Sequence, residues 1–451
     1  MKHHRPRLRD LRFYSARTQR LAIFLLGGAV VGGAAVALAL LADRAQAAFL
    51  GFIVRYPYAS LVVTPAGIAL SAWLTRRVFP NSQGSGIPQA IAARRLEDQA
   101  ARGRLVSIRI AIGKIVLTLF GLLCGASIGR EGPTVQVGAS IMFAIGRLAP
   151  RRQSGLILAG ASAGIAAAFN TPLAGIVFGI EEMSRAFEVR TGGLMLAGIV
   201  VAGLTSLGIL GDYTYFGTTS VGLHGVAGWA SLPVIAVCCG ILGGAFSRIL
   251  IEFGRGLPGA VGRAIRDRPI LFAAACGLGA ALCGIVSGNT IYGTGYAQVK
   301  ALIDHNVPLP QSFGLLKFAA TTLASISGVP GGIFSPSLAV GAGIGFNFAA
   351  LFPGVPLNAL ILLGMVSYFA GVVQAPITAA VIVTEMTNDH AMVIPLMAAA
   401  AIAFAASRLV CKEGVYHALS VNFLPRPEDE AGGSRGLPQR GSAGEIDRDK
   451  L

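Results

Sequence analysis

The chain has 451 residues, of which 54% are hydrophobic and only 13% are charged, and its formal net charge is +16. Soluble domains carry about 25% charged residues, and one water-surrounded core could not bury this much apolar surface. The composition therefore excludes a soluble globular protein and indicates an integral membrane protein. No compact basic domain carries the positive charge, which argues against a nucleic-acid partner.

The chain begins with a basic segment, residues 1–20, in which Asp10 is the one acidic residue. The apolar run Leu21–Ala42 follows without a polar interruption, and it is longer than the roughly 7–15 residues of a signal-peptide core. We expect this run to span a membrane. Its basic flank should be cytoplasmic, because cytoplasmic segments carry the excess of Lys and Arg and face anionic lipid.

More apolar runs follow along the chain, and a membrane-spanning helix needs ~20 such residues. The long runs are Leu156–Ile180, Leu194–Leu210, Ser231–Ile251, Ile270–Ser287 and Leu360–Thr384, and shorter Gly-interrupted runs are Thr134–Ile145 and Ile333–Leu351. The 60 Gly residues favour close helix packing and broken helices. The six Cys lack metal-ligand spacing, so we expect neither a disulfide framework nor a metal site.

An internal repeat relates two parts of the chain. The matching pairs are GSGIPQ at 84–89 with GTGYAQ at 293–298, PTVQVGASI at 133–141 with PSLAVGAGI at 336–344, LILAG at 156–160 with LILLG at 360–364, and Pro172 with Pro376. Their order is the same in both copies, which favours a true repeat over chance similarity among Gly/Ala-rich segments. Membrane proteins with two such halves usually bind their substrate between them, near the bilayer midplane.

The repeat predicts the organisation of the chain. Residues 21–210 and 226–424 form two membrane repeats, and a polar, Gly-rich linker joins them at 211–225. Residues 425–451 have mixed charge and no periodicity, which predicts a disordered cytosolic tail. The expected fold class is therefore an all-α integral membrane protein with two repeats of tilted and broken helices.

Three segments rich in Gly and Pro carry the clearest chemical signal: GSGIP (84–88), GREGP (129–133) and GGIFSP (331–336). Each precedes a stretch that can form a helix, and Pro is favoured in the first turn of a helix. A helix start presents unpaired N–H groups and the positive end of the helix dipole. Several helix starts aimed at one point form an anion site, so the pattern indicates anions rather than cations.

Acidic residues are rare in the apolar part of the chain. Glu131 is the only one between Asp98 and Glu181, and it lies in a helix-start motif. A carboxylate inside the membrane costs ~2.5–3.5 kcal/mol on insertion scales. Glu131 could compete with a dissolved anion for the same amides, or it could pair with Arg130 in a water-exposed loop. For Glu181 we favour a helix end at the membrane surface, whereas Glu182 could take protons from the cytosol.

Other single residues have competing interpretations. Lys114 lies in an apolar run and is expected to face a partner or the pore. A lone Tyr near the end of a membrane segment, such as Tyr416, is more often an interface anchor. GASAG at 160–164 matches the nucleophile elbow of hydrolases, but it lies in a Gly/Ala-rich stretch, and no His occurs between His4 and His224. We therefore favour helix packing there and expect no enzyme.

GSGIP, GREGP, GGIFSP and the late Tyr416, in this order and spacing, resemble the CLC family of chloride channels and chloride/proton antiporters. GKIVLTLFGLLCGASIGREGPTVQVG and AAAFNTPLAGIVFGIEEM are especially similar to the prokaryotic members. The resemblance covers roughly residues 20–424. It implies the CLC-type fold of two inverted-topology repeats, one anion pathway per subunit and a homodimer. The implied location is the cell inner membrane, with both termini in the cytoplasm.

The resemblance also implies roles for individual residues. The central anion would be bound by the hydroxyls of Ser85 and Tyr416 and by the amides of Ile333 and Phe334. Amides around Arg130 and Gly132 would form an outer anion site. Glu131 matches the gating glutamate, and Glu182 matches the internal proton-transfer glutamate of the antiporters.

Chloride and protons are the implied substrates, with membrane lipid as the surroundings and no cofactor, metal or nucleic acid. Glu182 favours chloride/proton antiport, because channel members generally lack an acid there; a passive voltage- or pH-gated chloride channel of the same fold is the alternative. Ser85 fits selectivity for chloride, whereas a Pro at this position would suggest nitrate. Members of the fluoride-exporting branch usually have altered GSGIP and GREGP motifs, and both motifs are intact in this sequence. Ile91 replaces a second internal carboxylate of some antiporters, which leaves cytosolic proton entry open. No nucleotide-binding module follows Tyr416, so we expect no regulation by adenine nucleotides.

Overall fold

The computed structural model describes residues 8–148, 152–184, 189–211 and 214–425, and every structural statement below concerns these residues. Residues 1–7 of the predicted basic segment and residues 426–451 of the predicted tail lie outside them. The described chain is helical throughout, and its extended pairings are two isolated bridges rather than strands. The predicted all-α fold is thereby confirmed.

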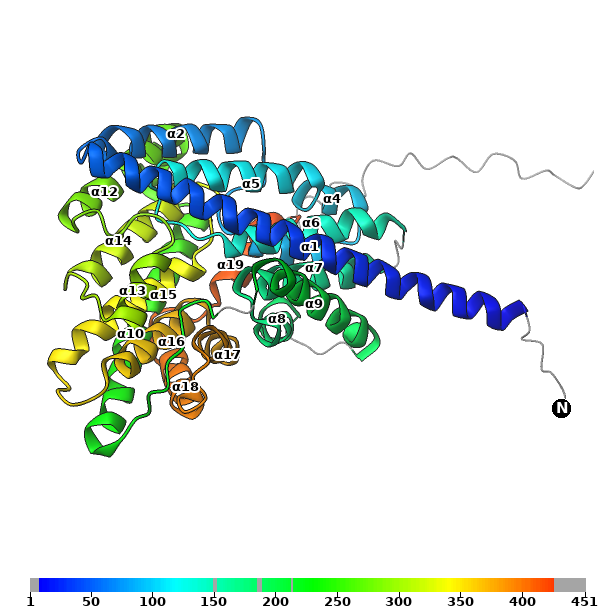
Figure 1. Cartoon of the computed structure of the whole chain (residues 1–451). Coiled ribbons are helices and arrows are strands. Elements are labelled where there is room, and N and C mark those ends of the chain that lie inside the picture. Colours follow the sequence, from blue (N-terminus) through cyan, green and yellow to red (C-terminus); the bar gives the residue numbers. More distant parts are fainter. Residues whose placement is uncertain (1–7, 149–151, 185–188, 212–213, 426–451) are drawn as a thin grey trace, which may run out of the picture.

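The first half contains the helices up to α9. In Figure 1, α1 is the long helix that crosses the molecule, and it packs against α9. The elements are α1 (Leu8–Arg55), α2 (Ser60–Arg77), α3 (Ile87–Arg95), α4 (Gln99–Leu105), α5 (Ile108–Leu123), α6 (Glu131–Ile145), the 3-10 turn Gly146–Leu148, α7 (Gln153–Phe169), α8 (Pro172–Phe178), the π-helical turn Gly179–Ser184 and α9 (Val189–Leu210).

The second half repeats much of this order. Its elements are α10 (Gly225–Arg255), α11 (Gly259–Asp267), α12 (Pro269–Val286), α13 (Tyr296–His305), α14 (Phe313–Ile326), α15 (Phe334–Asn347), the 3-10 turn Phe348–Ala350, α16 (Leu357–Val373), α17 (Pro376–Thr387), α18 (Val393–Val410), α19 (Val415–Ser420) and the 3-10 turn Val421–Phe423. The pair α6 and α7 packs closely, and so does the corresponding pair α15 and α16. The repeat seen in the sequence is therefore a repeat of helix pairs.

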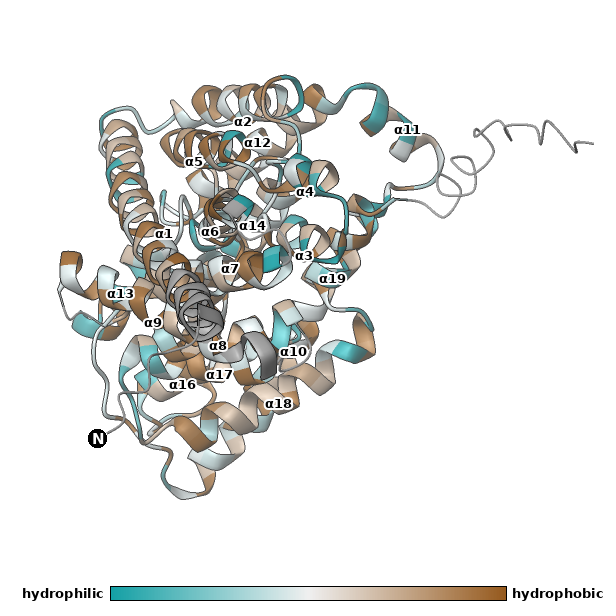
Figure 2. Cartoon of the chain, turned by 90° about the vertical axis from the view of Figure 1, so that its right-hand side faces the viewer, coloured by the Kyte–Doolittle hydropathy of each residue, from teal (hydrophilic) through white to brown (hydrophobic). Residues whose placement is uncertain are grey.

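The exterior is suited to lipid. Within the described residues, the spans long and apolar enough to cross a membrane are Leu21–Arg55, Gln99–Leu123, Gly225–Arg255, Pro269–Val286 and Val393–Val410. Large apolar side chains such as Leu26, Val62 and Leu282 are exposed on the outside. Figure 2 shows hydrophobic residues along most helices and a hydrophilic segment at the peripheral α11. The chain is a multi-pass membrane protein.

Two predicted spans are wrong as continuous helices. The run Leu156–Ile180 breaks at Asn170, and the run Leu360–Thr384 breaks at Gln374. Both residues adopt a left-handed conformation with φ of 56°. In each half a Pro then opens the next helix two residues later, because Pro lacks the N–H of a continuing helix and disfavours helical geometry in the residue before it.

The two short helices that follow these breaks cap each other. Glu181, just after α8, accepts a hydrogen bond of 2.6 Å from the backbone N–H of Thr378 at the start of α17. Glu385, near the end of α17, accepts one of 2.6 Å from the backbone N–H of Ala174 at the start of α8. This exchange requires the two helices to run in opposite directions, as inverted halves do. Glu181 therefore binds the opposite half as well as ending its own helical run.

Candidate functional site

The three Gly/Pro motifs meet at one place, and backbone hydrogen bonds join them. Gly129 of GREGP and Gly332 of GGIFSP exchange two bonds of 2.7 Å each. Gly331 donates to the carbonyl of Gly84 in GSGIP at 3.0 Å. Sequence reasoning expected several helix starts around one point, and these bonds bring the starts of α3, α6 and α15 together.

Close approach of the loops explains why Gly is needed within them. A Cβ atom on Gly132 would lie 2.9 Å from the carbonyl oxygen of Ser85 and 3.1 Å from the Cα of Gly332. Gly86 precedes α3 with φ of 92°, a conformation that disfavours any side chain. The predicted outer-site residue Gly132 and the predicted inner-site residue Ser85 are therefore immediate neighbours.

Two buried lysines hold the loops in place. Lys114, on α5, donates to the carbonyls of Ser82 at 2.5 Å and Gly84 at 2.8 Å, so its partner is the backbone that leads into GSGIP. Lys317, on α14, donates to the carbonyls of Ile291 and Gly293 in the matching loop of the second half. Sequence reasoning missed Lys317, although it occupies the same place in the second copy of the repeat as Lys114 does in the first, 19 residues before the Pro of the matched motif.

A cavity of about 390 Å³ opens on one side of this junction. Ser85, Ile333 and Tyr416 line it, and Arg76 stands among the lining residues. Tyr416 is 1% exposed, and its hydroxyl has no hydrogen-bond partner among the described residues. The general expectation that a lone Tyr anchors the membrane interface is wrong here, because the side chain is buried at the cavity.

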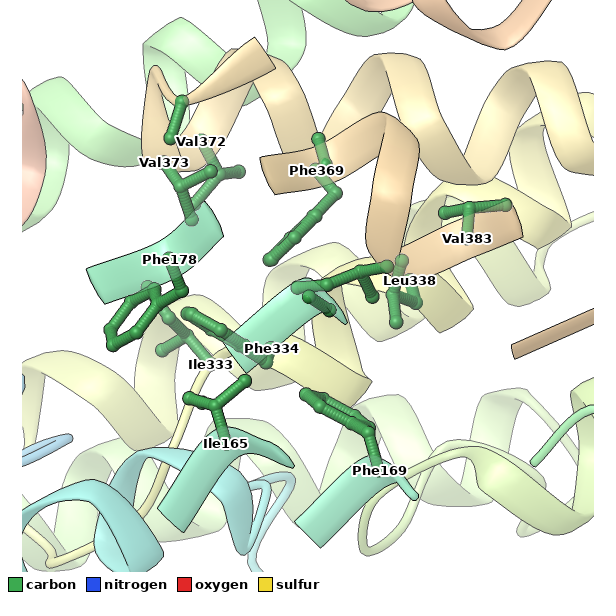
Figure 3. Close-up of a cluster of buried hydrophobic side chains, with 14 of the residues drawn as sticks. Ile165, Phe169, Phe178, Ile333, Phe334, Leu338, Phe369, Val372, Val373 and Val383 are labelled. Atoms are coloured by element: carbon green, nitrogen blue, oxygen red, sulfur yellow. The ribbon is translucent and has the colours of Figure 1, made fainter. Parts of the chain in front are cut away.

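Aromatic rings fix the start of α15. Figure 3 shows Phe334 between Phe178, Phe169 and Phe369, with Ile165 and Leu338 beside them. The ring centroid of Phe334 lies 4.8 Å from that of Phe369 and 6.0 Å from those of Phe178 and Tyr416. This packing orients the N–H groups at the start of α15 relative to Tyr416.

Glu131 is the first residue of α6 and is fully buried, so the interpretation as a water-exposed loop pair is wrong. Its Oε1 accepts hydrogen bonds from the hydroxyls of Ser335 at 2.5 Å and Tyr215 at 3.2 Å. The sequence placed Tyr215 in a linker and gave Ser335 no role. Both donors are hydroxyls, whereas the sequence argument expected backbone amides.

Arg130 is held away from the carboxylate of Glu131. Its Nη1 donates to the carbonyl of Ala39 and pairs with Asp43 on α1, both at 2.6 Å. Its Nε lies 4.0 Å from Oε1 of Glu131, at the limit of an ion pair. The guanidinium also lies over the ring of Tyr215, 5.8 Å from its centroid. The side chain of Arg130 thus anchors the GREGP loop to α1.

Glu182 lies in the π-helical turn and is 4% exposed. His417, the residue after Tyr416, has its Nε2 2.8 Å from the backbone carbonyl of Glu182 and 3.8 Å from its Oε1. Arg95 on α3 contacts Nδ1 of His417 at 2.9 Å. Glu182 is therefore linked through α19 to the cavity residue Tyr416. Ile91 is buried on α3 and supplies no carboxylate there.

Comparison with known proteins agrees with this geometry. The chain is 29% identical over 443 residues to the H(+)/Cl(-) exchange transporter ClcA of Yersinia pseudotuberculosis, covering 90% of this chain and 89% of that protein. It is 29% identical over 402 residues to ClcA of Yersinia pestis, covering 82% and 80%.

Solved structures have the same fold. A CLC-type fluoride/proton antiporter superposes with a TM-score of 0.76 at 22% identity, over 90% of this chain and 98% of that one. A slow cyanobacterial Cl-/H+ antiporter superposes with a TM-score of 0.73 at 23% identity, over 91% and 99%. The family model for voltage gated chloride channels matches residues 66–408. With that match over most of its length and the three motif loops joined at one site, this chain belongs to the CLC family of voltage gated chloride channels.

Proposed function

We propose that the chain is a chloride/proton antiporter. The observation that carries the proposal is the position of Glu131, a fully buried carboxylate at the junction of the three motif loops. The next residue, Gly132, packs against Ser85, which lines the cavity together with Tyr416. A group that can be neutral or charged at this point can govern both ions. The related proteins from Yersinia are named H(+)/Cl(-) exchange transporters, which supports the same activity for this chain.

Chloride occupies the inner cavity in this proposal. Ser85 and Tyr416 line that space, and the hydroxyl of Ser85 and the free hydroxyl of Tyr416 can donate hydrogen bonds to an anion. The first amides of α15, at Ile333 and Phe334, add the positive end of a helix dipole. Amides near Arg130 and Gly132 form the outer site, which the ionised Glu131 side chain closes. Arg76 at the cavity attracts anions toward it.

Protons follow a path that shares only its outer part with chloride. Protonation of Glu131 removes the charge that blocks the anion path, so one carboxyl group both opens the path and carries a proton. Glu182 exchanges protons with the cytosolic side, at a buried position beside His417. The acid at Glu182 favours antiport over a passive channel, because a channel needs no internal proton acceptor. Ion gradients drive this exchange without a cofactor.

We place the protein in the bacterial inner membrane as a homodimer, with both termini in the cytoplasm. The dimer is supported by the surface over α8, α9, α17 and α18, which lie together in Figure 1. Leu173, Leu204, Ile377 and Ile394 are exposed on these helices, close to the partly buried carboxylates of Glu181 and Glu385. A carboxylate facing lipid is costly, so protein is the better cover for this surface. Crosslinking in lipid should give dimers; only monomers, or trimers, would refute this assembly.

The test of antiport uses purified protein in chloride-loaded liposomes, with chloride efflux and proton uptake recorded together. Wild-type protein should take up protons as chloride leaves. Glu131→Gln mimics the protonated form, so chloride should still leave while proton uptake stops. Glu182→Gln should also stop proton uptake but leave chloride efflux sensitive to external pH.

Three outcomes would overturn parts of this proposal. Wild-type chloride efflux without proton uptake would indicate the passive channel instead. Undiminished proton uptake by Glu131→Gln would refute the role of that carboxylate. Efflux of fluoride far faster than chloride would assign to this chain the fluoride transport for which one of the structural neighbours is named.

A further inference from the structure

The carboxylate of Glu131 is held by two hydroxyl groups from distant parts of the chain. Ser335 comes from the first turn of α15 in the second half, and Tyr215 comes from the segment between α9 and α10. Their oxygens lie 2.5 Å and 3.2 Å from Oε1 and 3.4 Å from each other. All three side chains are buried, and Oε2 has no hydrogen-bond partner within the described chain.

The geometry of Tyr215 leaves its hydroxyl little freedom. Its ring contacts Phe169, Phe216 and Tyr296 at centroid distances of 5.4, 5.0 and 4.5 Å. The backbone N–H of Phe216 donates to the carbonyl of Met386 at the end of α17, at 3.0 Å. The segment predicted as a linker is therefore hydrogen-bonded to the second half, while its Tyr215 hydroxyl donates to Glu131 in the first half.

Each hydroxyl has one proton to donate, and an ionised carboxylate is the stronger acceptor. Hydrogen bonds to a charged group are roughly twice as strong as neutral ones. When Glu131 takes up a proton, both bonds to Oε1 fall to the neutral strength. The two hydroxyls therefore distinguish the charged side chain, which they hold firmly, from the neutral one, which they hold weakly.

Within the part of the chain that the structure describes, the other charged and titratable groups near Glu131 donate no hydrogen bond to its carboxylate. Arg130 gives its Nη1 to Asp43 and Ala39 and remains 4.0 Å from Oε1. Tyr296 contacts the ring of Tyr215, and Tyr416 lies beyond Phe334 on the side of the inner cavity. Among the described residues, the donors to the Glu131 carboxylate are thus the hydroxyls of Ser335 and Tyr215.

We propose that Ser335 and Tyr215 are positioning residues that latch the ionised Glu131 side chain across the anion path and thereby set the external pH at which chloride flows. The inference rests on the proposed gating role of Glu131. A proton from the outer solution binds the carboxylate, the latch weakens, and the side chain leaves. The two hydroxyls then face the path as free donors for the incoming anion.

The test is the dependence of chloride efflux on external pH for Ser335→Ala, Tyr215→Phe and the double variant in liposomes. Loss of one hydroxyl disfavours the charged, latched form, so less acid is needed to open the path. We expect the pH of half-maximal efflux to rise by about one unit, a tenfold change in proton concentration, for each single variant. Ser335→Thr keeps the hydroxyl and should restore the wild-type profile.

Two matched controls separate the latch from general packing. Ser337→Ala makes the same change on the same helix, at a buried hydroxyl that does not contact Glu131. Tyr296→Phe removes a hydroxyl from a ring that packs on Tyr215. Neither control should shift the pH profile. In a Glu131→Gln background, Ser335→Ala should have no effect on pH dependence, because Gln does not titrate.

The outcomes distinguish failure of the latch from failure of the proposed function. Unmoved pH profiles in Ser335→Ala and Tyr215→Phe, with Glu131→Gln still abolishing proton uptake, would overturn the latch and leave antiport intact. A downward shift would contradict the sign of the argument. Wild-type efflux without any pH dependence or proton uptake would instead overturn the proposed function on which the latch rests.

Discussion

The reciprocal capping of α8 and α17 makes a quantitative prediction about stability. Glu385→Ala removes the acceptor for the N–H groups of Leu173 and Ala174, which donate at 3.2 and 2.6 Å. Hydrogen bonds to a charged acceptor contribute about 1.5–3 kcal/mol, and this carboxylate is partly exposed. Exposure lowers the contribution to about 1 kcal/mol for each of the two bonds, so we expect the free energy of unfolding to fall by about 2 kcal/mol.

Glu181→Ala should cost more, because the two halves differ at one position. Glu181 accepts from the N–H groups of Ile377 and Thr378 and also from the Thr378 hydroxyl at 2.7 Å. The matching residue in the first half is Ala174, which has no hydroxyl. Glu181 is also partly exposed, so this third hydrogen bond adds about 1 kcal/mol, the same discounted contribution as each of the other two. The expected loss for Glu181→Ala is therefore about 3 kcal/mol. When Glu181→Ala is introduced into a Thr378→Ala background, the further loss should be close to that of Glu385→Ala, about 2 kcal/mol.

The measurement is equilibrium unfolding of the purified variants in mixed micelles, followed by circular dichroism. Glu252→Ala is the control, since Glu252 and Arg248 form an exposed pair one helical turn apart, with side-chain exposures of 51% and 61%. Such pairs contribute only about 0.3–0.5 kcal/mol. If Glu181→Ala and Glu385→Ala cost no more than Glu252→Ala, the capping argument is refuted. If Glu385→Ala costs more than Glu181→Ala, the role given to the Thr378 hydroxyl is refuted.

Three further predictions concern the anion path. Ser85→Pro removes a hydroxyl donor and should shift selectivity from chloride toward nitrate, measured as the ratio of initial efflux rates; an unchanged ratio would place the selective site elsewhere. Tyr416→Ala enlarges the cavity and removes the free Tyr416 hydroxyl, so fewer protons should be counter-transported for each chloride ion. An unchanged ratio of protons to chloride in this variant would show that Tyr416 does not restrict the anion path. Lys114→Met leaves the carbonyls of Ser82 and Gly84 without their donor, so it should lower the free energy of unfolding by about 2–4 kcal/mol and slow the chloride flux. Lys114→Arg should recover part of the stability and part of the flux. An unchanged free energy of unfolding in Lys114→Met would show that those hydrogen bonds contribute little.

The sequence by itself determined the features that depend on neighbouring residues. Composition and apolar runs predicted a membrane protein, since lipid tolerates few charges. Gly and Pro in GSGIP, GREGP and GGIFSP predicted helix starts, because backbone conformation at these residues is a local property. The ordered repeat predicted two halves with the substrate site between them. Glu131 was singled out as the lone acidic residue in a helix-start motif, whereas Ser85 was implied by the resemblance to the CLC family.

The tertiary structure decided which distant groups touch. The long apolar runs looked continuous because hydrophobicity does not record a left-handed residue such as Asn170 or Gln374. Ser335 lies 204 positions after Glu131, and Tyr215 lies 84 positions after it, so no local pattern could pair them. Glu181 and its partner Thr378 are 197 positions apart. A buried polar group must find a partner, but which partner it finds depends on how the two inverted halves pack, and only the folded chain decides that.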